Sequence, residues 1–313
     1  FAPITGVISD SFARGKSAWL AALNECNELN ILQHDITQPL LSEMLTADFI
    51  VHAASIASPT YYRENPIAVM DANVNGLRHL LDHVSERQGT NHPVSGLLFF
   101  STSEIYGDPD KDNIPTTEEY RGSVSCTGPR ACYDESKRYG ETLCVNFAQQ
   151  LGLPITIVRP FNNYGPGLKL TDKRLPCDVA RNVLSGDDVV LLSDGSPTRT
   201  FCYIADAVVG YYKVLFKGEA GRSYNIGNDA PEISIRDFAE RNIAAARDVL
   251  DYKGNLRFAS SADADYLTDN PHRRCPNIDR ARTELGYAPS ITLEDGVARA
   301  LTWYAGNQSA EEE

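Results

Sequence analysis

Mainly apolar runs alternate with amphipathic segments through the first half of the chain. The runs at residues 47–54, 96–101 and 154–159 predict buried strands, because their apolar side chains follow one another over the length of a strand. Apolar residues at helical spacing predict helices at 66–86 and 134–151. Strands that alternate with helices are typical of βαβ units. The pattern therefore predicts an α/β fold in which a Rossmann-type, doubly wound parallel sheet is covered by helices.

The pattern becomes less regular near residue 167, where shorter strands are mixed with helices. The predicted strands lie at 189–192, 201–204 and 223–226, and the predicted helices at 176–185, 205–217, 234–249, 279–286 and 293–304. We therefore expect two domains. Residues 1–166 form the Rossmann-type domain, and residues 167–313 form a smaller α+β substrate lobe, from which some strands or helices return to the first domain.

Charge and hydropathy exclude two classes of partner. The 313-residue chain has a formal net charge of −13 and no run of Lys or Arg, so we expect neither nucleic acid nor an anionic membrane surface as a partner. No apolar stretch reaches the length of about 18 residues that spans a bilayer. A small anionic substrate is compatible with this composition, because it needs only a local basic pocket.

The cysteines and histidines predict neither disulfides nor a metal site. Seven cysteines are scattered without a C-x-x-C pair, which favours reduced thiols in a cytoplasmic protein. The six histidines include one H-x-x-x-H pair, His79 and His83, but no H-E-x-x-H motif, and we expect no bound metal.

Polar residues follow each of the predicted buried strands in the first half. Parallel sheets bind ligands at the carboxyl ends of their strands. Residues 52–58, 102–106 and 162–167 lie at these ends. We therefore expect ligand-binding side chains in these three segments.

Tyr133 and Lys137 form a Y-x-x-x-K pair near the start of a predicted helix. Residues four apart lie on one face of a helix, one turn from each other. A lysine ammonium near a phenol favours the phenolate, so a group that ordinarily titrates near pH ~10 becomes a usable base near neutrality. Tyrosine and lysine are common on helix surfaces, so the meaning of the pair depends on the other motifs.

The glycine-rich turn of a dinucleotide-binding unit is missing from this sequence. Such a unit opens with a strand, a G-x-G-x-x-G turn and a helix, but Gly6 and Gly15 are too far apart to cradle a pyrophosphate. Asp10 follows a short apolar run and is a candidate for the acidic residue that holds the adenosine ribose. We expect that roughly the first 30 residues of a standard unit are trimmed or disordered here. The alternative is a protein that has lost cofactor binding.

Nine motifs, in the order of one known family, extend from Asp10 to near Tyr304. They are 10–15 (DSFARG), 34–37 (HDIT), 52–59 (HAASIASP), 101–108 (STSEIYGD), 117–120 (TEEY), 128–137 (GPRACYDESK), 159–166 (RPFNNYGP), 198–201 (TRTF) and 270–276 (NPHRRCP). On these motifs the chain resembles the extended short-chain dehydrogenase/reductases, and among them most the NAD-dependent UDP-glucuronate decarboxylases (UDP-xylose synthases). Two positions depart from the decarboxylase pattern: Gly167 stands where those enzymes usually carry Arg, and Ser136 where they often carry Gly.

The resemblance implies a catalytic set at the strand ends and on the helix. Tyr133 takes the proton of the sugar 4-hydroxyl while C4 passes hydride to NAD, Lys137 lowers the tyrosine pKa and binds the nicotinamide ribose, and Thr102 hydrogen-bonds the 4-oxygen. Ser103 and Glu104 stand where related 4,6-dehydratases carry Asp-Glu, so ordinary dehydration is disfavoured. The pair fits handling of the C5 proton or the C6 carboxylate, which leaves as carbon dioxide once C4 is a ketone.

The resemblance also implies two binding sets. NAD is expected at Asp10, Asp35, Ile36, Ala53, Ala54, Ser55, Asn73, Tyr133, Lys137 and Arg159. A UDP-sugar is expected at Ser58, Glu104, Tyr106, Asn162, Arg174, Arg199 and Arg274, since arginine forks suit phosphate or carboxylate groups. The first domain would then bind NAD and the second the nucleotide sugar. Helices at about 66–86 and 134–151 commonly form a four-helix interface in this family, which implies a homodimer.

Two alternatives to decarboxylation stay open from the sequence. One is a C4 epimerase, or an unusual dehydratase, that acts on another nucleotide sugar, because the sequence does not reveal to which face of a 4-keto sugar the hydride returns. The other is a non-catalytic protein that binds nucleotide sugars. The presence of Thr102, Tyr133 and Lys137 together argues against this second alternative.

Overall fold

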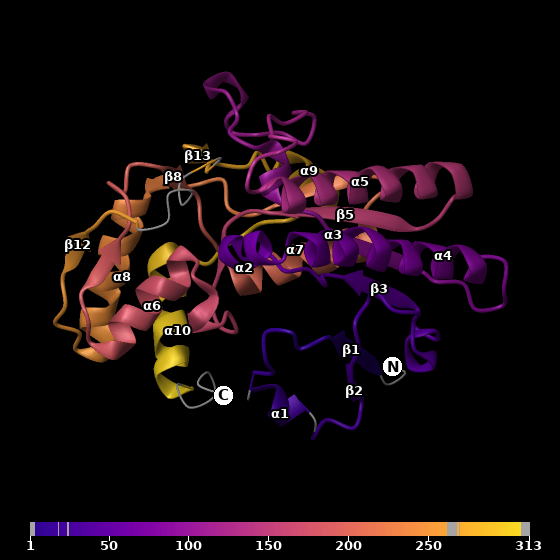
Figure 1. Ribbon diagram of the computed structural model, residues 1–313, viewed down its shortest axis with the longest axis horizontal. Coiled ribbons are helices and arrows are strands. Elements are labelled where there is room, and N and C mark those ends of the chain that lie inside the picture. The colour runs from indigo at the N-terminus through magenta and orange to yellow at the C-terminus, as the bar shows by residue number, and fades with distance from the viewer. Residues whose placement is uncertain (1–3, 18, 24, 262–267, 269, 308–313) are drawn as a thin grey trace.

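Four parallel strands form the main sheet of the protein, and Figure 1 labels two of them, β3 and β5. The computed structural model describes residues 4–17, 19–23, 25–261, 268 and 270–307. The main sheet has the order β10-β5-β4-β3, with β3 (Phe49–His52), β4 (Gly96–Phe100), β5 (Ile155–Pro160) and β10 (Ser223–Ile226). The predicted α/β fold with a parallel sheet is confirmed. Strand β10 comes from the part of the chain beyond residue 167 and pairs with β5.

Helices cover both faces of this sheet, because alternate side chains of a strand point to opposite faces. Leu97 and Phe99 of β4 pack with the apolar sides of α4 (Leu77–Arg87) and α5 (Ala131–Leu151). Leu98, between them, packs on the other face with α7 (Ile204–Lys217) and α9 (Asp279–Leu285). Strand β4, inside the sheet, is thus buried on both faces.

Helix α5 approaches β4 closely at Gly140. A β-carbon at this position would lie 2.5 Å from Cζ of Phe99, so the absence of a side chain lets the helix lie at this distance. Lys137 lies three residues earlier on the same side of the helix and is 1% exposed. The close approach therefore brings the first turns of α5 against the carboxyl end of β4.

The helix predicted over 66–86 is interrupted in the structure. It consists of α3 (Pro66–Asp71), a wider π-helical turn η2 (Ala72–Gly76) and α4. Gly76 packs against Ile36, where a β-carbon would lie 2.7 Å from Cγ2. Asn73 is fully buried and donates to Ser136 Oγ of α5 at 2.9 Å. The helix thus widens where it makes these tertiary contacts, and the spacing of its apolar residues does not indicate the widening.

A two-stranded parallel sheet lies apart from the main one. It contains β1 (Gly6–Asp10) and β2 (Leu29–Gln33) and lies below β3 in Figure 1. In the described part of the chain β3 pairs with β4 alone, and Phe49 and Val51 are 44% and 49% exposed. Parallel strands are ordinarily buried on both faces, so β3 is an uncovered edge of the main sheet in this structure.

Beyond residue 167, short strands and helices pack around a separate aromatic core, in which Phe201 stacks on Phe238 with ring centroids 4.0 Å apart. Helix α8 begins at a capping box in which the Ser234 hydroxyl accepts from the Asp237 N–H. The helices are α6 (Leu175–Ser185), α8 (Ile235–Leu250) and α10 (Leu293–Gly306). The strand pairings are β7 (Val189–Leu191) with β12 (Leu256–Phe258), β8 (Thr198–Arg199) with β11 (Ile233–Ser234) and β13 (Arg273–Arg274), and β6 (Asn163–Tyr164) with β9 (Cys202–Tyr203).

Short elements connect these parts. They are helices α1 (Trp19–Leu23) and α2 (Pro59–Glu64), and the 3-10 turns η1 (Ser42–Met44), η3 (Ser103–Tyr106), η4 (Lys111–Asn113) and η5 (Leu170–Asp172). Of the helices that the structure describes, none is long and apolar enough to cross a membrane.

A buried ion pair joins β5 to α5. Arg159 donates from Nε and Nη2 to the two carboxylate oxygens of Glu141, at 2.8 and 2.6 Å. Its Nη1 donates to the Tyr106 hydroxyl at 2.6 Å and to the Glu118 carbonyl at 2.9 Å. These side chains are buried, so each charge depends on its partner to replace lost hydration.

Removing Glu141 should therefore destabilise the protein strongly. We expect Glu141→Ala to lower the free energy of unfolding by about 3–5 kcal/mol, because Arg159 would stay buried without its counter-charge. Glu294→Ala breaks an exposed ion pair with Arg241 and should cost less than about 1 kcal/mol. Urea denaturation followed by circular dichroism measures both variants. Similar losses of unfolding free energy in the two variants would show that the Arg159–Glu141 pair does not stabilise the fold.

Candidate active site

A cavity of about 680 Å³ is lined by residues from the carboxyl ends of β3, β4 and β5 and from the second half of the chain. Among the residues that the structure describes, eight Lys or Arg side chains line it, against two carboxylates, those of Glu104 and Asp178. A protein with a net charge of −13 thus concentrates positive charge inside one cleft. Such a cleft attracts anionic ligands.

Tyr133 and Lys137 lie on one face of α5, and both line the cavity. Lys137 Nζ lies 5.9 Å from the centroid of the Tyr133 ring and donates to the Phe100 carbonyl at 2.7 Å. Thr102, just beyond the end of β4, also lines the cavity and hydrogen-bonds the Tyr133 side chain. The structure thus brings the Y-x-x-x-K pair and Thr102 together at one point.

Burial shifts both titratable groups of this pair in the ligand-free protein. It raises the pKa of Tyr133 to about 12, although the hydrogen bond with Thr102 opposes the shift. It lowers the pKa of Lys137 to about 7, so the ammonium is only partly charged near neutral pH. The phenolate expected near neutrality is therefore not the state of the ligand-free protein, in which Tyr133 keeps its proton.

Two arginines enclose the carboxylate of Glu104. Arg274 of β13 donates from Nη1 and Nη2 to the two carboxylate oxygens, each at 2.6 Å, and Arg130, the residue before α5, pairs with Oε2. Burial alone would raise the pKa of Glu104, but the charges of Arg130 and Arg274 lower it to about 2. Glu104 is therefore ionised at neutral pH and can accept a proton but not supply one. Ser103 lines the cavity beside it.

Arg199 and Arg174 line the cavity from the second half of the chain. Arg199 donates to the backbone carbonyls of Thr198 at 2.7 Å and Pro271 at 2.6 Å. Burial and the nearby charge of Arg274 lower the pKa of Arg199 to about 9. Arg174 instead forms an ion pair with Asp172. Arg199 is thus held by neutral acceptors, which leaves its charge for an anionic ligand.

Several buried polar atoms at the cavity have no hydrogen-bond partner among the described residues. Asn162 Nδ2, Ser55 Oγ and Ser101 Oγ belong to residues that line the cavity, and Asn73 Oδ1 belongs to the turn that contacts α5. Buried polar atoms are ordinarily hydrogen-bonded. These atoms therefore fit a polar ligand that would occupy the cleft. Ala53 lines the cavity as well, but Ala54 is not among the described residues that do.

Four other predicted ligand-binding residues lie outside the lining of the cavity. Asp10 and Asp35 are exposed near the carboxyl ends of β1 and β2, and Ile36 packs against the core of the main sheet. Ser58 is buried and donates to the Asp172 carbonyl at 2.7 Å. The structure thus does not bring these four residues to the cavity.

Tyr106, predicted for substrate binding, and Arg159, predicted for cofactor binding, contact other residues of the protein in this structure. Neither residue lines the cavity. The Arg159 guanidinium is occupied by Glu141 and by the Tyr106 hydroxyl. That hydroxyl in turn donates to Asn225 Oδ1 at 2.8 Å. Both side chains therefore stabilise the packing of β5, α5 and the neighbouring loops.

Arg130 is a cavity residue that was not predicted from the sequence. It stands three residues before Tyr133, within the 128–137 motif, and this spacing places two side chains on one side of a helix start. Its position three residues before a candidate catalytic tyrosine is therefore the sequence signal that could have identified Arg130.

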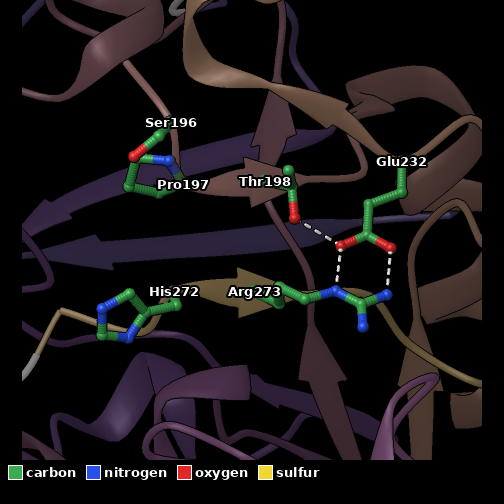
Figure 2. Close-up of a pocket in the computed structure, with 6 residues that line it drawn as sticks. All are labelled: Ser196, Pro197, Thr198, Glu232, His272 and Arg273. Atoms are coloured by element: carbon green, nitrogen blue, oxygen red, sulfur yellow. Dashed lines mark hydrogen bonds and ion pairs between the residues drawn. The ribbon is translucent and has the colours of Figure 1, made fainter. Parts of the chain in front are cut away.

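A second, shallower hollow of about 420 Å³ lies where β8, β11 and β13 meet (Figure 2). Glu232 there pairs with Arg273 at 2.6 Å and accepts a hydrogen bond from the Thr198 hydroxyl. His272 Nδ1 is hydrogen-bonded to Asp108 Oδ2 at 2.8 Å. Among the residues that line this hollow, the charges thus satisfy one another.

The match to a family model defines the class of protein to which this fold and cavity belong. The chain belongs to the NAD dependent epimerase/dehydratase family, whose model matches residues 4–227. The resemblance seen in the sequence motifs is thus confirmed at the level of the family.

The curated relatives are similar over nearly the whole chain. The chain is 32% identical over 296 residues to UDP-glucuronic acid decarboxylase 1 of Arabidopsis thaliana, covering 95% of this chain and 63% of that protein. It is 34% identical over 301 residues to UDP-glucuronic acid decarboxylase 1 of Xenopus tropicalis, covering 95% and 65%. The chain therefore spans less than two thirds of the length of these two relatives.

Solved structures share the fold. A dTDP-glucose 4,6-dehydratase of Streptomyces venezuelae with NAD and TYD bound has a TM-score of 0.82 at 25% identity, over 99% of this chain and 91% of that chain. A UDP-glucuronic acid 4-epimerase of Bacillus cereus, in complex with UDP-glucuronic acid and NAD, has a TM-score of 0.73 at 23% identity, over 95% and 90%. These likenesses confirm the Rossmann-type fold.

The ion cluster around Glu104 predicts a defined acid dependence of stability. Its folded-state pKa of about 2 lies below the ordinary value of 4.5, so its contribution to stability is complete above about pH 4.5 and is lost as the pH falls toward 2. Glu104→Gln removes this contribution. The difference in free energy of unfolding between parent and variant should be constant above about pH 5 and shrink from about pH 5 to 3. Urea denaturation at a series of pH values measures it, and a difference that stays constant down to about pH 3 would exclude the lowered pKa.

Proposed function

We propose that this protein decarboxylates UDP-glucuronate to UDP-xylose through a 4-keto sugar, with NAD as its cofactor. The proposal is carried by one observation: a single basic cavity holds Tyr133 and Thr102 together with the ionised Glu104 and its two arginines. Similarity to UDP-glucuronic acid decarboxylases over 95% of the chain supports it.

The residues proposed to hold NAD lie on the main-sheet side of the cavity. When bound, NAD supplies the group that accepts and returns the hydride of C4. Lys137 is proposed to bind the nicotinamide ribose, and Ala53 and Ser55 to line its pocket. The buried Ser55 Oγ and Asn73 Oδ1, which have no partner among the described residues, support a polar occupant. Asp10 lies outside this cavity, at the end of β1, and is proposed for the more distant adenosine half.

Tyr133 and Thr102 move the proton of the sugar 4-hydroxyl in this mechanism. Thr102 hydrogen-bonds Tyr133, so an oxygen placed between them exchanges its proton with the phenol. Burial keeps Tyr133 protonated in the ligand-free protein. The phenolate therefore forms when positive charge, including that of Lys137, acts on the ring, since a nearby cation favours the anionic form.

Glu104 and Ser103 suit loss of a carboxylate rather than loss of water. With C4 as a ketone, the C6 carboxylate is β to it, and the C5–C6 electrons pass into an enolate as carbon dioxide leaves. A proton added to C5 and the return of the hydride to C4 then give the pentose. Expulsion of a C6 hydroxyl would require an acid. Glu104, with a pKa of about 2, is ionised, and Ser103 carries no carboxyl group. Decarboxylation needs no such acid at C6.

The diphosphate is proposed to lie against Arg199, Arg174 and Asn162, all of which line the cavity. Guanidinium forks match phosphate oxygens, and Asn162 has a buried amide nitrogen without a partner among the described residues. Arg274 faces Glu104 instead. We accordingly propose that residues 1–166 bind NAD and that residues 167–313 bind the nucleotide sugar.

UDP-glucuronate incubated with the protein and NAD should lose one carbon dioxide, which mass spectrometry detects as UDP-xylose. Tyr133→Phe should slow the reaction ~10²–10⁴-fold, because it removes the proton-transfer group but keeps the ring that stacks on Tyr62. Tyr212→Phe, on the exposed side of α7, is the matched control and should keep the rate. A product of unchanged mass would indicate an epimerase. No conversion by the natural full-length protein would refute the proposed activity.

We also propose that two copies pair through α3 and α5 and act in the cytoplasm. The two helices contact each other, and they expose the apolar side chains of Ile67, Met70, Tyr139 and Leu151. Exposed apolar side chains on adjoining helices are candidates for a contact surface. All seven cysteines are free thiols, which supports a reducing compartment.

A charge on this surface should separate the copies. Tyr139→Glu should convert a dimer into a monomer, because it places a carboxylate against apolar side chains of the partner. Tyr212→Glu changes an equally exposed tyrosine on α7 and should leave the dimer intact. Light scattering coupled to size-exclusion chromatography gives both masses. A parent protein of monomer mass would exclude the dimer.

A further inference from the structure

Arg130 is a buried, cavity-lining arginine that the fold holds next to the proposed catalytic tyrosine. It is 8% exposed, and its carbonyl accepts the Tyr133 N–H at 3.0 Å. Its guanidinium pairs with Glu104, and its Nε lies 3.8 Å from Asp134 Oδ2. The guanidinium carbon lies 5.9 Å from the ring centroid of Tyr62, which stacks on Tyr133 at 5.2 Å. Its position is therefore set from several sides.

The positive charge and the hydrogen-bond donors around Glu104 suffice to bind a second anion. Three guanidiniums, those of Arg130, Arg199 and Arg274, act on this one carboxylate. The Nε atoms of Arg130 and Arg274 are buried and make no hydrogen bond to any residue that the structure describes. Buried donors of this kind are ordinarily satisfied, so the cluster is incomplete without a further acceptor.

We propose that Arg130 is a specificity-determining residue that binds the carboxylate of the sugar, and that Glu104 occupies its guanidinium until the substrate arrives. This deepens the proposed function and rests on it, since the ligand is a nucleotide-linked uronic acid. The sugar carboxylate carbon is two carbons from C4, whose hydroxyl meets Tyr133. Arg130 precedes Tyr133 by about one helical turn and lines the same cavity. We therefore expect Arg130 to be within reach of a carboxylate two carbons from C4.

The exchange of one carboxylate for another explains why a uronic acid would be selected. A planar guanidinium matches a carboxylate in shape and charge. When the sugar carboxylate takes the place of Glu104, Arg130 keeps a counter-charge throughout, so no buried cation is left unpaired. A neutral hexose displaces Glu104 but brings no carboxylate to pair with Arg130. Selection against the neutral sugar then arises from the cost of separating this ion pair.

The test compares a charged and a neutral sugar in a variant whose turnover is strongly slowed. Isothermal titration calorimetry measures binding of UDP-glucuronate and of UDP-glucose to Tyr133→Phe, with and without Arg130→Gln. We expect Arg130→Gln to weaken UDP-glucuronate binding at least about tenfold and to leave UDP-glucose binding at least as strong as before, because no Arg130–Glu104 ion pair is then separated. Arg130→Lys should restore part of the preference, because it returns the charge without the fork. Arg241→Gln, which removes an exposed arginine, is the control and should change neither affinity.

Other outcomes separate this inference from the proposed function. Carbon dioxide release by the parent protein together with an unchanged sugar preference in Arg130→Gln would overturn the role of Arg130 and leave decarboxylation standing. An Arg130-dependent preference for UDP-glucuronate without carbon dioxide release would support the subsite and remove decarboxylation. Equal losses for both sugars would also overturn the subsite. If Arg130→Gln fails to fold, Arg130→Lys carries the comparison, and an unchanged preference there counts against the proposal.

Discussion

Close packing of α5 against β4 positions most of the proposed catalytic groups. The missing side chain at Gly140 lets the helix approach Phe99, and Lys137, about one turn earlier, donates to the last carbonyl of β4. Tyr133 and Arg130 follow toward the start of the helix in steps of three or four residues and line the same cavity. One helix–strand contact therefore positions the tyrosine, the lysine and the arginine at the carboxyl end of β4.

Burial then makes each charge in this cavity depend on its neighbours. Lys137 and Tyr133, both buried, shift toward their neutral forms. Glu104 is also buried, yet it stays ionised because two arginines face it. Burial thus favours the neutral form of Tyr133 and Lys137 but leaves Glu104 charged. The difference is that opposite charges lie within contact distance of Glu104. An acidic protein can in this way present a strongly basic cleft to an anionic ligand.

The sequence was informative where the signal is local and ambiguous where it is not. The strands over 96–101 and 154–159 followed from runs of apolar residues and are present as β4 and β5. The wider turn at 72–76 did not follow, because it depends on contacts with residues far along the chain, such as Ser136. Arg159 lies in a family motif, and motif membership does not distinguish a residue that binds a ligand from one that satisfies a buried partner.

By itself, the sequence determined the α/β class, the Y-x-x-x-K pair and the family, because periodicity and motif order are properties of the chain read in one dimension. Only the tertiary structure decided which side chains share the cavity. It joined Glu104 to Arg130 and to Arg274, which is 170 residues away, and it turned Arg159 inward to Glu141. The physical reason is that burial and Coulomb interactions depend on distance in space, and side chains remote in sequence supply the compensating charge.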